Sequence, residues 1–172
     1  MSKAKAMVAV VLGSDSDWPV MKETVALLNK LKVPSEVRVI SAHRTPDEAA
    51  AFARGAERSG IRVIIAAAGG AAHLAGALAS HVTLPVIGVP LEGWALGGLD
   101  ALLSTVQMPA GVPVATVAIG KAGARNAAIL AAQILALGDA ALAARLRSMR
   151  IKAREAIASM DKAIRGEAAG GK

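Results

Sequence analysis

Three short clusters of polar residues interrupt a chain of 172 residues that is 54% hydrophobic. They are residues 14–17 (Ser-Asp-Ser-Asp), 41–44 (Ser-Ala-His-Arg) and 69–73 (Gly-Gly-Ala-Ala-His). Serine hydroxyls such as those of Ser14 and Ser16, a guanidinium and the free N–H groups of a helix N-terminus can together bind phosphate. The Asp17 carboxylate would repel phosphate, but it can accept hydrogen bonds from ribose hydroxyls. The clusters therefore predict a site for a phosphorylated riboside, with helix capping as the alternative role of Ser16 and Asp17.

His43 is the best candidate for acid–base chemistry in these clusters, since it lies beside Arg44 and Ser41. Imidazole titrates near neutral pH, so it can accept and donate a proton under physiological conditions. A structural role is the alternative for a single histidine in a loop. His73 is expected to line the same site, and Gly69-Gly70 allows either a close approach of the backbone to a ligand or a tight turn.

Several other chemistries are excluded by composition and spacing. The chain has no cysteine and only three histidines, so we expect no metal site, and a cysteine nucleophile is impossible. Gly120-Lys121 is followed by Ala122 instead of Ser or Thr, and no Gly-x-Gly-x-x-Gly follows the first predicted strand. A nucleoside triphosphate or a dinucleotide is therefore not expected. Aromatic residues make up 2% of the chain, too few for a platform that stacks single-stranded nucleic acid.

Five apolar segments that alternate with helical patterns must position the clusters. The predicted strands are residues 8–12, 37–40, 63–67, 85–89 and 114–119. Their apolar character indicates a parallel sheet with helices on both faces, which is a doubly wound three-layer α/β/α fold. Ligands bind such sheets beyond the carboxyl ends of the strands, so the three clusters are expected in one crevice. Thr45 and Glu48 have the spacing of a capping box, and Pro46 falls at the first position of the helix they predict.

The positive charge is concentrated near the C-terminus. The net charge is +7, and from residue 142 onward eight basic residues oppose three acidic ones, whereas residues 1–141 hold twelve and ten. Apolar residues recur there at intervals of three and four, which predicts an amphipathic helix over residues 142–165. They are Leu142, Leu146, Met149, Ala153, Ile157, Met160 and Ile164. We expect this stripe to pack on its own domain or a neighbouring subunit, with nucleic acid or a membrane as alternatives. Residues 166–172 are expected to be disordered.

Two stretches without charged residues, 63–91 and 101–120, are long enough to cross a membrane. Both contain Gly and Pro at positions typical of turns, so we expect short strands and helices there and no membrane partner. The short polar N-terminus is unlike a signal peptide. The expected location is therefore the cytoplasm.

Six blocks between about Val8 and Leu137 carry a resemblance to a known family. They are residues 13–18 (GSDSDW), 41–46 (SAHRTP), 68–74 (AGGAAHL), 85–90 (PVIGVP), 104–109 (STVQMP) and 118–123 (AIGKAG). In this order they resemble the class I N5-carboxyaminoimidazole ribonucleotide mutase family of purine biosynthesis. Ala67 and Ala75 stand where that family usually has Gly and Pro.

The resemblance implies a flavodoxin-like catalytic domain over residues 1–141 and a homo-octamer whose active sites are shared between subunits. It implies no metal and no organic cofactor. His43 would be the general acid and base, and the substrate-binding residues would be Ser14, Ser16, Asp17, Ser41, Arg44, Ala68, Gly69, Gly70 and His73. The helix over residues 142–165 lies outside the resemblance, and its apolar stripe is the reason that we expect it to be an assembly element.

Two other functions remain open at this stage. One is a carboxylase that uses free CO2 and aminoimidazole ribonucleotide, although the related class with that activity lacks the Gly-Gly-Ala-Ala-His block. The other is a non-catalytic mononucleotide-binding module whose basic tail contacts nucleic acid. The mutase and the carboxylase differ in their substrate, whereas the binding module would show no turnover.

Overall fold

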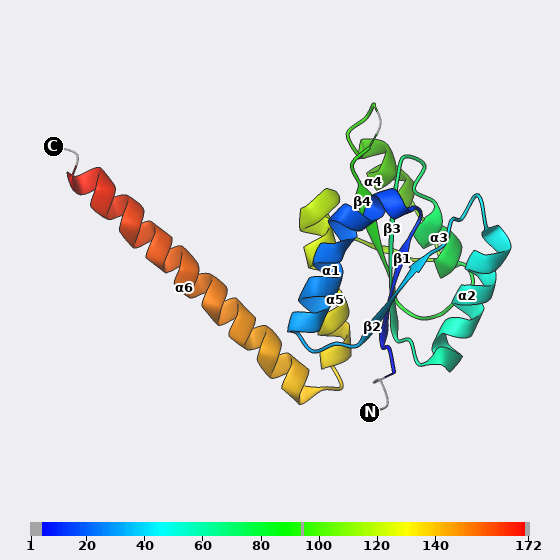
Figure 1. Cartoon of the computed structure of the whole chain (residues 1–172), viewed down its shortest axis with the longest axis horizontal. Helices are drawn as coiled ribbons and strands as arrows, with labels where there is room; N and C mark the ends of the chain where they lie inside the picture. Colours follow the sequence, from blue (N-terminus) through cyan, green and yellow to red (C-terminus); the bar gives the residue numbers. More distant parts are fainter. Residues whose placement is uncertain (1–4, 94, 171–172) are drawn as a thin grey trace.

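The computed structural model describes residues 5–93 and 95–170 and arranges them as one parallel sheet with helices on both faces (Figure 1). The elements in chain order are β1 (Val8–Leu12), the 3-10 helix η1 (Asp15–Asp17), α1 (Trp18–Lys30), β2 (Ser35–Val39), α2 (Pro46–Ser59), β3 (Val63–Gly69), α3 (Leu74–Ala79), β4 (Val86–Leu91), α4 (Leu99–Val106), β5 (Ala115–Thr116), α5 (Gly120–Ala136) and α6 (Ala140–Gly170). The strand order is β2-β1-β3-β4-β5. This order has its switch point between β1 and β3, where flavodoxin-like proteins bind their ligands.

Alternation along the central strands builds the two halves of the core. Val8, Val10 and Leu12 of β1 pack in one buried cluster with α1 and α5. Ala9 and Val11, which point the other way, belong to a second buried cluster with α2 and α3. Because the central strands are covered on both faces, their sequences are continuously apolar. The predicted three-layer α/β/α fold is confirmed.

The two edge strands differ from the sequence expectation. β2 begins at Ser35 instead of residue 37, and the side chains of Val37 and Val39 are exposed. β5 keeps only Ala115 and Thr116 of the predicted residues 114–119, and the Val117 N–H still donates to the Gly88 carbonyl at 3.1 Å. Each edge strand has one neighbour, so its length is set by where the chain turns away and less by its apolar pattern.

The predicted start of α2 is confirmed, but the predicted capping box does not form. Pro46 occupies the first turn, as expected, and the Thr45 side chain makes no cap hydrogen bond. The Thr45 hydroxyl instead accepts the Ser41 N–H and lies 3.1 Å from the Ser41 carbonyl oxygen. Glu48 pairs with Arg38 of β2 at 3.1 Å. Thr45 therefore closes the loop that carries His43. The spacing of the capping motif did not predict this role of Thr45.

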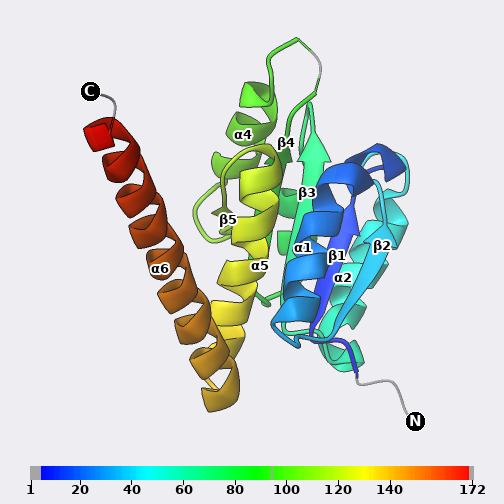
Figure 2. The ribbon, with the colours of Figure 1, turned by 60° about the vertical axis from the view of Figure 1, so that its left-hand side comes forward.

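The terminal helix α6 docks on the domain only through its first turns. It begins at Ala140, where the Asp139 carboxylate accepts the Leu142 N–H at 2.9 Å. Leu142 is buried, Leu146 and Met149 pack against the core, and the Arg145 guanidinium donates to the Leu31 carbonyl at 2.8 Å. Beyond these residues the helix extends away from the sheet (Figures 1 and 2). The apolar stripe thus continues past the part of the helix that its own domain covers.

The far end of α6 differs from the disorder expected after residue 165. The helix continues to Gly170, and residues 171–172 lie outside the described residues. Glu167, Ala168 and Ala169 favour helix, which offsets the cost of about 1 kcal/mol for a helical Gly166. Among residues 5–93 and 95–170, none of the helices combines the length and apolar character needed to cross a membrane.

Candidate active site

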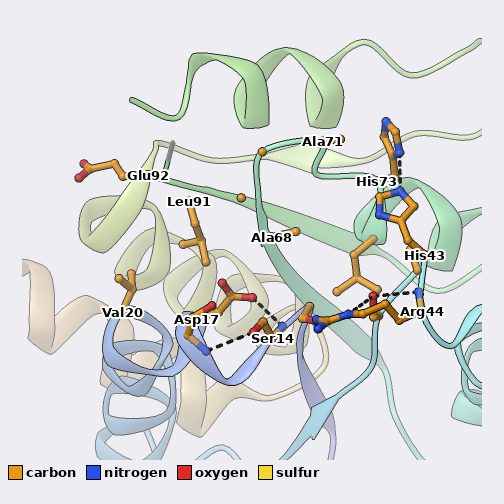
Figure 3. Close-up of a pocket in the computed structure, with 18 residues that line it drawn as sticks. Ser14, Asp17, Val20, His43, Arg44, Ala68, Ala71, His73, Leu91 and Glu92 are labelled. Carbon is orange, nitrogen blue, oxygen red and sulfur yellow. Dashed lines mark hydrogen bonds between the residues drawn. The ribbon is translucent and has the colours of Figure 1, made fainter. Parts of the chain in front are cut away.

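A cavity of about 630 Å³ lies at the carboxyl ends of β1, β3 and β4 (Figure 3). The loops after β1, β2 and β3 all contribute to its lining, as the parallel topology requires. All ten of the residues singled out from the sequence line it: Ser14, Ser16, Asp17, Ser41, His43, Arg44, Ala68, Gly69, Gly70 and His73. The structure therefore brings together residues that are up to 59 positions apart in the chain.

The first loop is shaped by a capping box between Ser14 and Asp17. The Ser14 hydroxyl accepts the Ser16 N–H at 3.4 Å, and the Asp17 carboxylate accepts the Ser14 N–H at 3.0 Å. The N-capping role considered for Asp17 does not form: Asp17 is the N-cap of α1 but its side chain makes no cap hydrogen bond there, and it instead closes the capping box whose N-cap is Ser14. Asp15 also accepts the Ser16 N–H, at 3.0 Å. These bonds set the position of the Asp17 carboxyl group beside the cavity.

Asp17 is half-buried, and this burial raises the pKa of its carboxyl group above the ordinary value of 3.8. The N–H groups of Ser14 and Gly13 and the charge of Arg44 act in the opposite direction and do not cancel the effect. Removing a carboxylate from water disfavours its charged form. A charged group held in place against this cost is typical of functional sites.

Replacing Asp17 with asparagine should stabilise the unliganded protein at neutral pH. Since the folded pKa is raised, the stability contributed by Asp17 is present below the unfolded pKa and is lost as the pH rises through the folded pKa. The uncharged amide of asparagine would avoid that loss, and its oxygen would still accept the Ser14 N–H. Thermal unfolding should therefore show a higher midpoint for Asp17→Asn than for the wild type at neutral pH, and a shrinking difference in acid. A difference that is the same at every pH would contradict the electrostatic explanation.

Arg44 of the second loop is held by hydrogen bonds to its own loop and to the end of β1. Its backbone N–H and its Nε both lie within hydrogen-bond distance of the Ser41 hydroxyl, at 3.1 and 3.3 Å. Its Nη2 donates to the Gly13 carbonyl at 2.8 Å, so the side chain joins the loop after β2 to the end of β1. A guanidinium anchored in this way loses little side-chain entropy when its other N–H groups bind an anion.

His43 and His73 lie against each other on one side of the cavity. Nε2 of His43 lies 2.8 Å from Nδ1 of His73, and the rings are edge to face with their centroids 5.0 Å apart (Figure 3). At this distance one nitrogen must donate and the other accept, so the pair shares a single proton between its facing nitrogens. Both side chains are exposed. The arrangement can therefore pass a proton between a bound molecule and the second imidazole.

The two glycines of the third loop have different roles. Gly70 has a φ of 62°, in the left-handed region that side chains other than glycine rarely adopt. A Cβ at Gly69 would make only ordinary contacts, 3.5 Å from the Leu91 carbonyl oxygen. The tight-turn interpretation thus holds for Gly70, which redirects the chain so that His73 lies at the start of α3.

The cavity also includes residues that the sequence argument missed. Val20 lines it from α1, and Leu91, Glu92 and Gly93 line it from the end of β4. The available signal was the topology: the carboxyl end of a fourth parallel strand must reach the same edge of the sheet. The fourth strand was expected to end at residue 89, but β4 continues to Leu91. The sequence argument therefore did not place Glu92, which follows Leu91, at the end of a strand. In the part of the chain described, no group of three His, Asp or Glu side chains is placed to hold a metal ion.

The sheet has the flavodoxin strand order, and serine, arginine and histidine side chains line one cavity at its carboxyl edge. These features define a doubly wound α/β protein with a ligand site at the switch point of the sheet. The family model described as AIR carboxylase matches residues 7–156. The chain belongs to this family.

Individual relatives agree with this assignment. The chain is similar to the N5-carboxyaminoimidazole ribonucleotide mutase of Brucella melitensis, with 56% identity over 151 residues, 88% of this chain and 93% of the relative. Its similarity to the protein of the same name from Escherichia coli K12 is 56% over 145 residues, 84% of this chain and 86% of the relative. Among solved structures it is similar to Treponema denticola PurE, with a TM-score of 0.80, 27% identity, and coverage of 91% of this chain and 98% of that one.

Proposed function

We propose that this protein is an isomerase of purine biosynthesis that converts N5-carboxyaminoimidazole ribonucleotide to 4-carboxyaminoimidazole ribonucleotide. Relatives with 56% identity carry the name of this mutase, and the family model spans most of the chain. The observation that carries the assignment at the site is the paired His43 and His73 in one cavity with Arg44. The reaction moves a carboxyl group from nitrogen to carbon without a net change in atoms or electrons, so it needs no redox cofactor.

The substrate is held by the polar loops at two places. Arg44, Ser14 and Ser16 bind the phosphate, assisted by Ser41, which already fixes the Arg44 side chain. Asp17 accepts hydrogen bonds from the ribose hydroxyls. The backbone around Ala68, Gly69 and Gly70, with His73, surrounds the carboxyl group. With these contacts the aminoimidazole ring would lie beside His43, which lines the same cavity.

The chemical steps require one proton that moves in both directions. The N5–carboxyl bond breaks, CO2 leaves, and His43 supplies a proton to the nitrogen that retains the bonding electrons. C4 of the electron-rich ring then attacks the trapped CO2, and His43 removes the C4 proton to restore the aromatic ring. The proton count is unchanged at the end. Holding the ring and CO2 together replaces an encounter in solution by a reaction within one complex.

A paired assay tests the proposed substrate. Purified protein receives either N5-carboxyaminoimidazole ribonucleotide or aminoimidazole ribonucleotide with bicarbonate, and the formation of the 4-carboxy product is measured. Turnover with the first substrate and little with the second is expected. The reverse result would assign the protein to the carboxylases that use free CO2, and the absence of turnover with either substrate would favour a binding module.

The assembly we propose is a homo-octamer in the cytoplasm whose active sites are shared between subunits, with α6 beyond residue 142 as an assembly element. Ile157, Met160 and Ile164 support this proposal, since their side chains are 60–65% exposed along one stripe of α6. Apolar residues repeated along a helix favour a protein partner over nucleic acid, because they would gain nothing from a phosphate backbone. The charged substrate does not cross membranes, which is the basis for placing the enzyme in the cytoplasm.

Introducing charge into this stripe should reduce the size of the oligomer. The double substitution Ile157→Asp and Ile164→Asp leaves Leu142 and Met149 packed on the subunit's own core, so the fold should be retained. Light scattering after size exclusion should give a lower mass than that of the wild type. Lys162→Asp, which places a carboxylate outside the apolar stripe, is the control and should leave the mass unchanged. An unchanged mass in the double variant would show that the stripe does not hold subunits together.

A further inference from the structure

The block Ser104-Thr105 lies outside the cavity, yet it contacts the loop that forms one wall of the cavity. Both residues are on α4, which packs against β4 at Gly88. A Cβ at Gly88 would overlap the Thr105 methyl group, so the helix and the strand are in close contact at this point. Thr105 is buried, and its hydroxyl donates to the Ala101 carbonyl at 2.7 Å. α4 is therefore a rigid support beside β4.

The Ser104 hydroxyl connects this support to the third loop. It donates to the Asp100 carbonyl of its own helix at 2.6 Å and accepts the Ala72 N–H at 3.1 Å. A hydroxyl has one hydrogen and two lone pairs, so these two bonds are compatible. The Asp100 carbonyl is nearer than the Ala101 and Gly70 carbonyls, at 3.3 and 3.4 Å, so it is the favoured acceptor of the hydroxyl hydrogen, and a lone pair remains for the Ala72 N–H. Ala72 is 2% exposed, so water would not readily replace this acceptor.

A continuous series of contacts leads from Ser104 to the acid–base pair. Ala72 directly precedes His73, whose Nδ1 lies 2.8 Å from Nε2 of His43. On the other side of Ala72, Gly70 is in the left-handed conformation and fixes the direction of the chain. A loop held at Gly70 by its backbone conformation and at Ala72 by a hydrogen bond has little freedom to rotate His73 away from His43.

We propose that Ser104 is a positioning residue, which acts on the reaction through Ala72 and His73 without touching the substrate. Its hydroxyl fixes the loop so that His73 stays within hydrogen-bond distance of His43. This inference rests on the proposed function for its effect on catalysis, but the contact between Ser104 and the loop can be measured without any substrate.

The test compares Ser104→Ala with Ser104→Thr in the full-length protein. Alanine removes the hydroxyl from a helical position where alanine is well tolerated, and threonine restores it. Ser104→Ala should lower kcat about tenfold and leave KM within about twofold, since the bond positions His73 and contributes little to binding of the phosphate. Hydrogen–deuterium exchange should be faster at Ala72 and His73 in Ser104→Ala. Ser104→Thr should recover most of the lost kcat and the slow exchange.

Ser80→Ala is the matched control. Ser80 is also near a helix end, and its hydroxyl bonds only to the Ala77 carbonyl of α3, at 2.8 Å, among the hydrogen bonds of the described residues. It should leave both kcat and exchange at Ala72 unchanged. Unchanged kcat in Ser104→Ala, or no recovery in Ser104→Thr, would overturn the positioning role. Lack of turnover in the wild type would overturn the proposed function instead, and exchange at Ala72 would still decide whether Ser104 holds the loop.

Discussion

Replacing His43 with asparagine is expected to lower kcat by a factor of about 10² to 10⁴, the usual contribution of a positioned general acid or base. Asparagine has a similar size near the backbone and keeps a polar group, but it cannot carry a proton at neutral pH. Both proposed steps, protonation of the leaving nitrogen and removal of the C4 proton, would lose their catalyst. The phosphate would still meet Arg44, whose anchoring bonds to Ser41 and Gly13 do not involve His43.

Binding and turnover should therefore separate in His43→Asn. Steady-state kinetics measures the loss of kcat, and calorimetric titration with the product measures the affinity, which should stay within about tenfold of that of the wild type. His81→Asn is the matched control, because His81 is exposed and lies outside the lining of the active-site cavity. If His43→Asn retained more than about a tenth of the wild-type kcat, His43 would not be the acid and base.

The site was more predictable from the sequence than its internal contacts were. Ser14 and His43 come shortly after predicted strands and Gly69 ends a third, and parallel topology alone brings such positions to one edge of a sheet. The hydrogen bond between His43 and His73 could not be predicted, because it depends on the angle at which two loops leave different strands. The φ of 62° at Gly70 sets one of these angles, and the Thr45 hydroxyl sets the other by closing its loop on Ser41.

The same limit applies where a pattern has more than one physical outcome. Thr45 and Glu48 have the spacing of a capping box, but Arg38 on β2 offers Glu48 a charged partner, and the Ser41 backbone offers Thr45 two bonds. Local sequence shows which groups are available, whereas the fold determines which partners they meet. The stripe of α6 is a similar case, since its periodicity shows an apolar face and does not show that the subunit covers only its first turns.

Gly123, in the first turns of α5, has no room for a side chain. A Cβ at this position would overlap the Ala118 carbonyl oxygen and lie 2.7 Å from its carbonyl carbon. Backbone atoms cannot rotate away as a side chain can, so the turn that leads from β5 into α5 would have to shift. Gly123→Ala should lower the free energy of unfolding by about 3 kcal/mol or more, the upper part of the range for overpacking.

The same substitution at Gly55 should have the opposite effect. Gly55 lies inside α2, and a Cβ there would meet nothing within 4 Å. Alanine restricts the unfolded chain and favours helix, so Gly55→Ala should raise the free energy of unfolding by about 0.5–1 kcal/mol. Urea denaturation of the two variants, followed by circular dichroism, measures both changes. Helix propensity alone predicts stabilisation in both variants. A destabilised Gly123→Ala beside a stabilised Gly55→Ala would therefore show that the space between α5 and its preceding turn requires the glycine.

A shift of this turn should also disturb the active site. Gly120, at the start of α5, lies against Glu92, which lines the cavity.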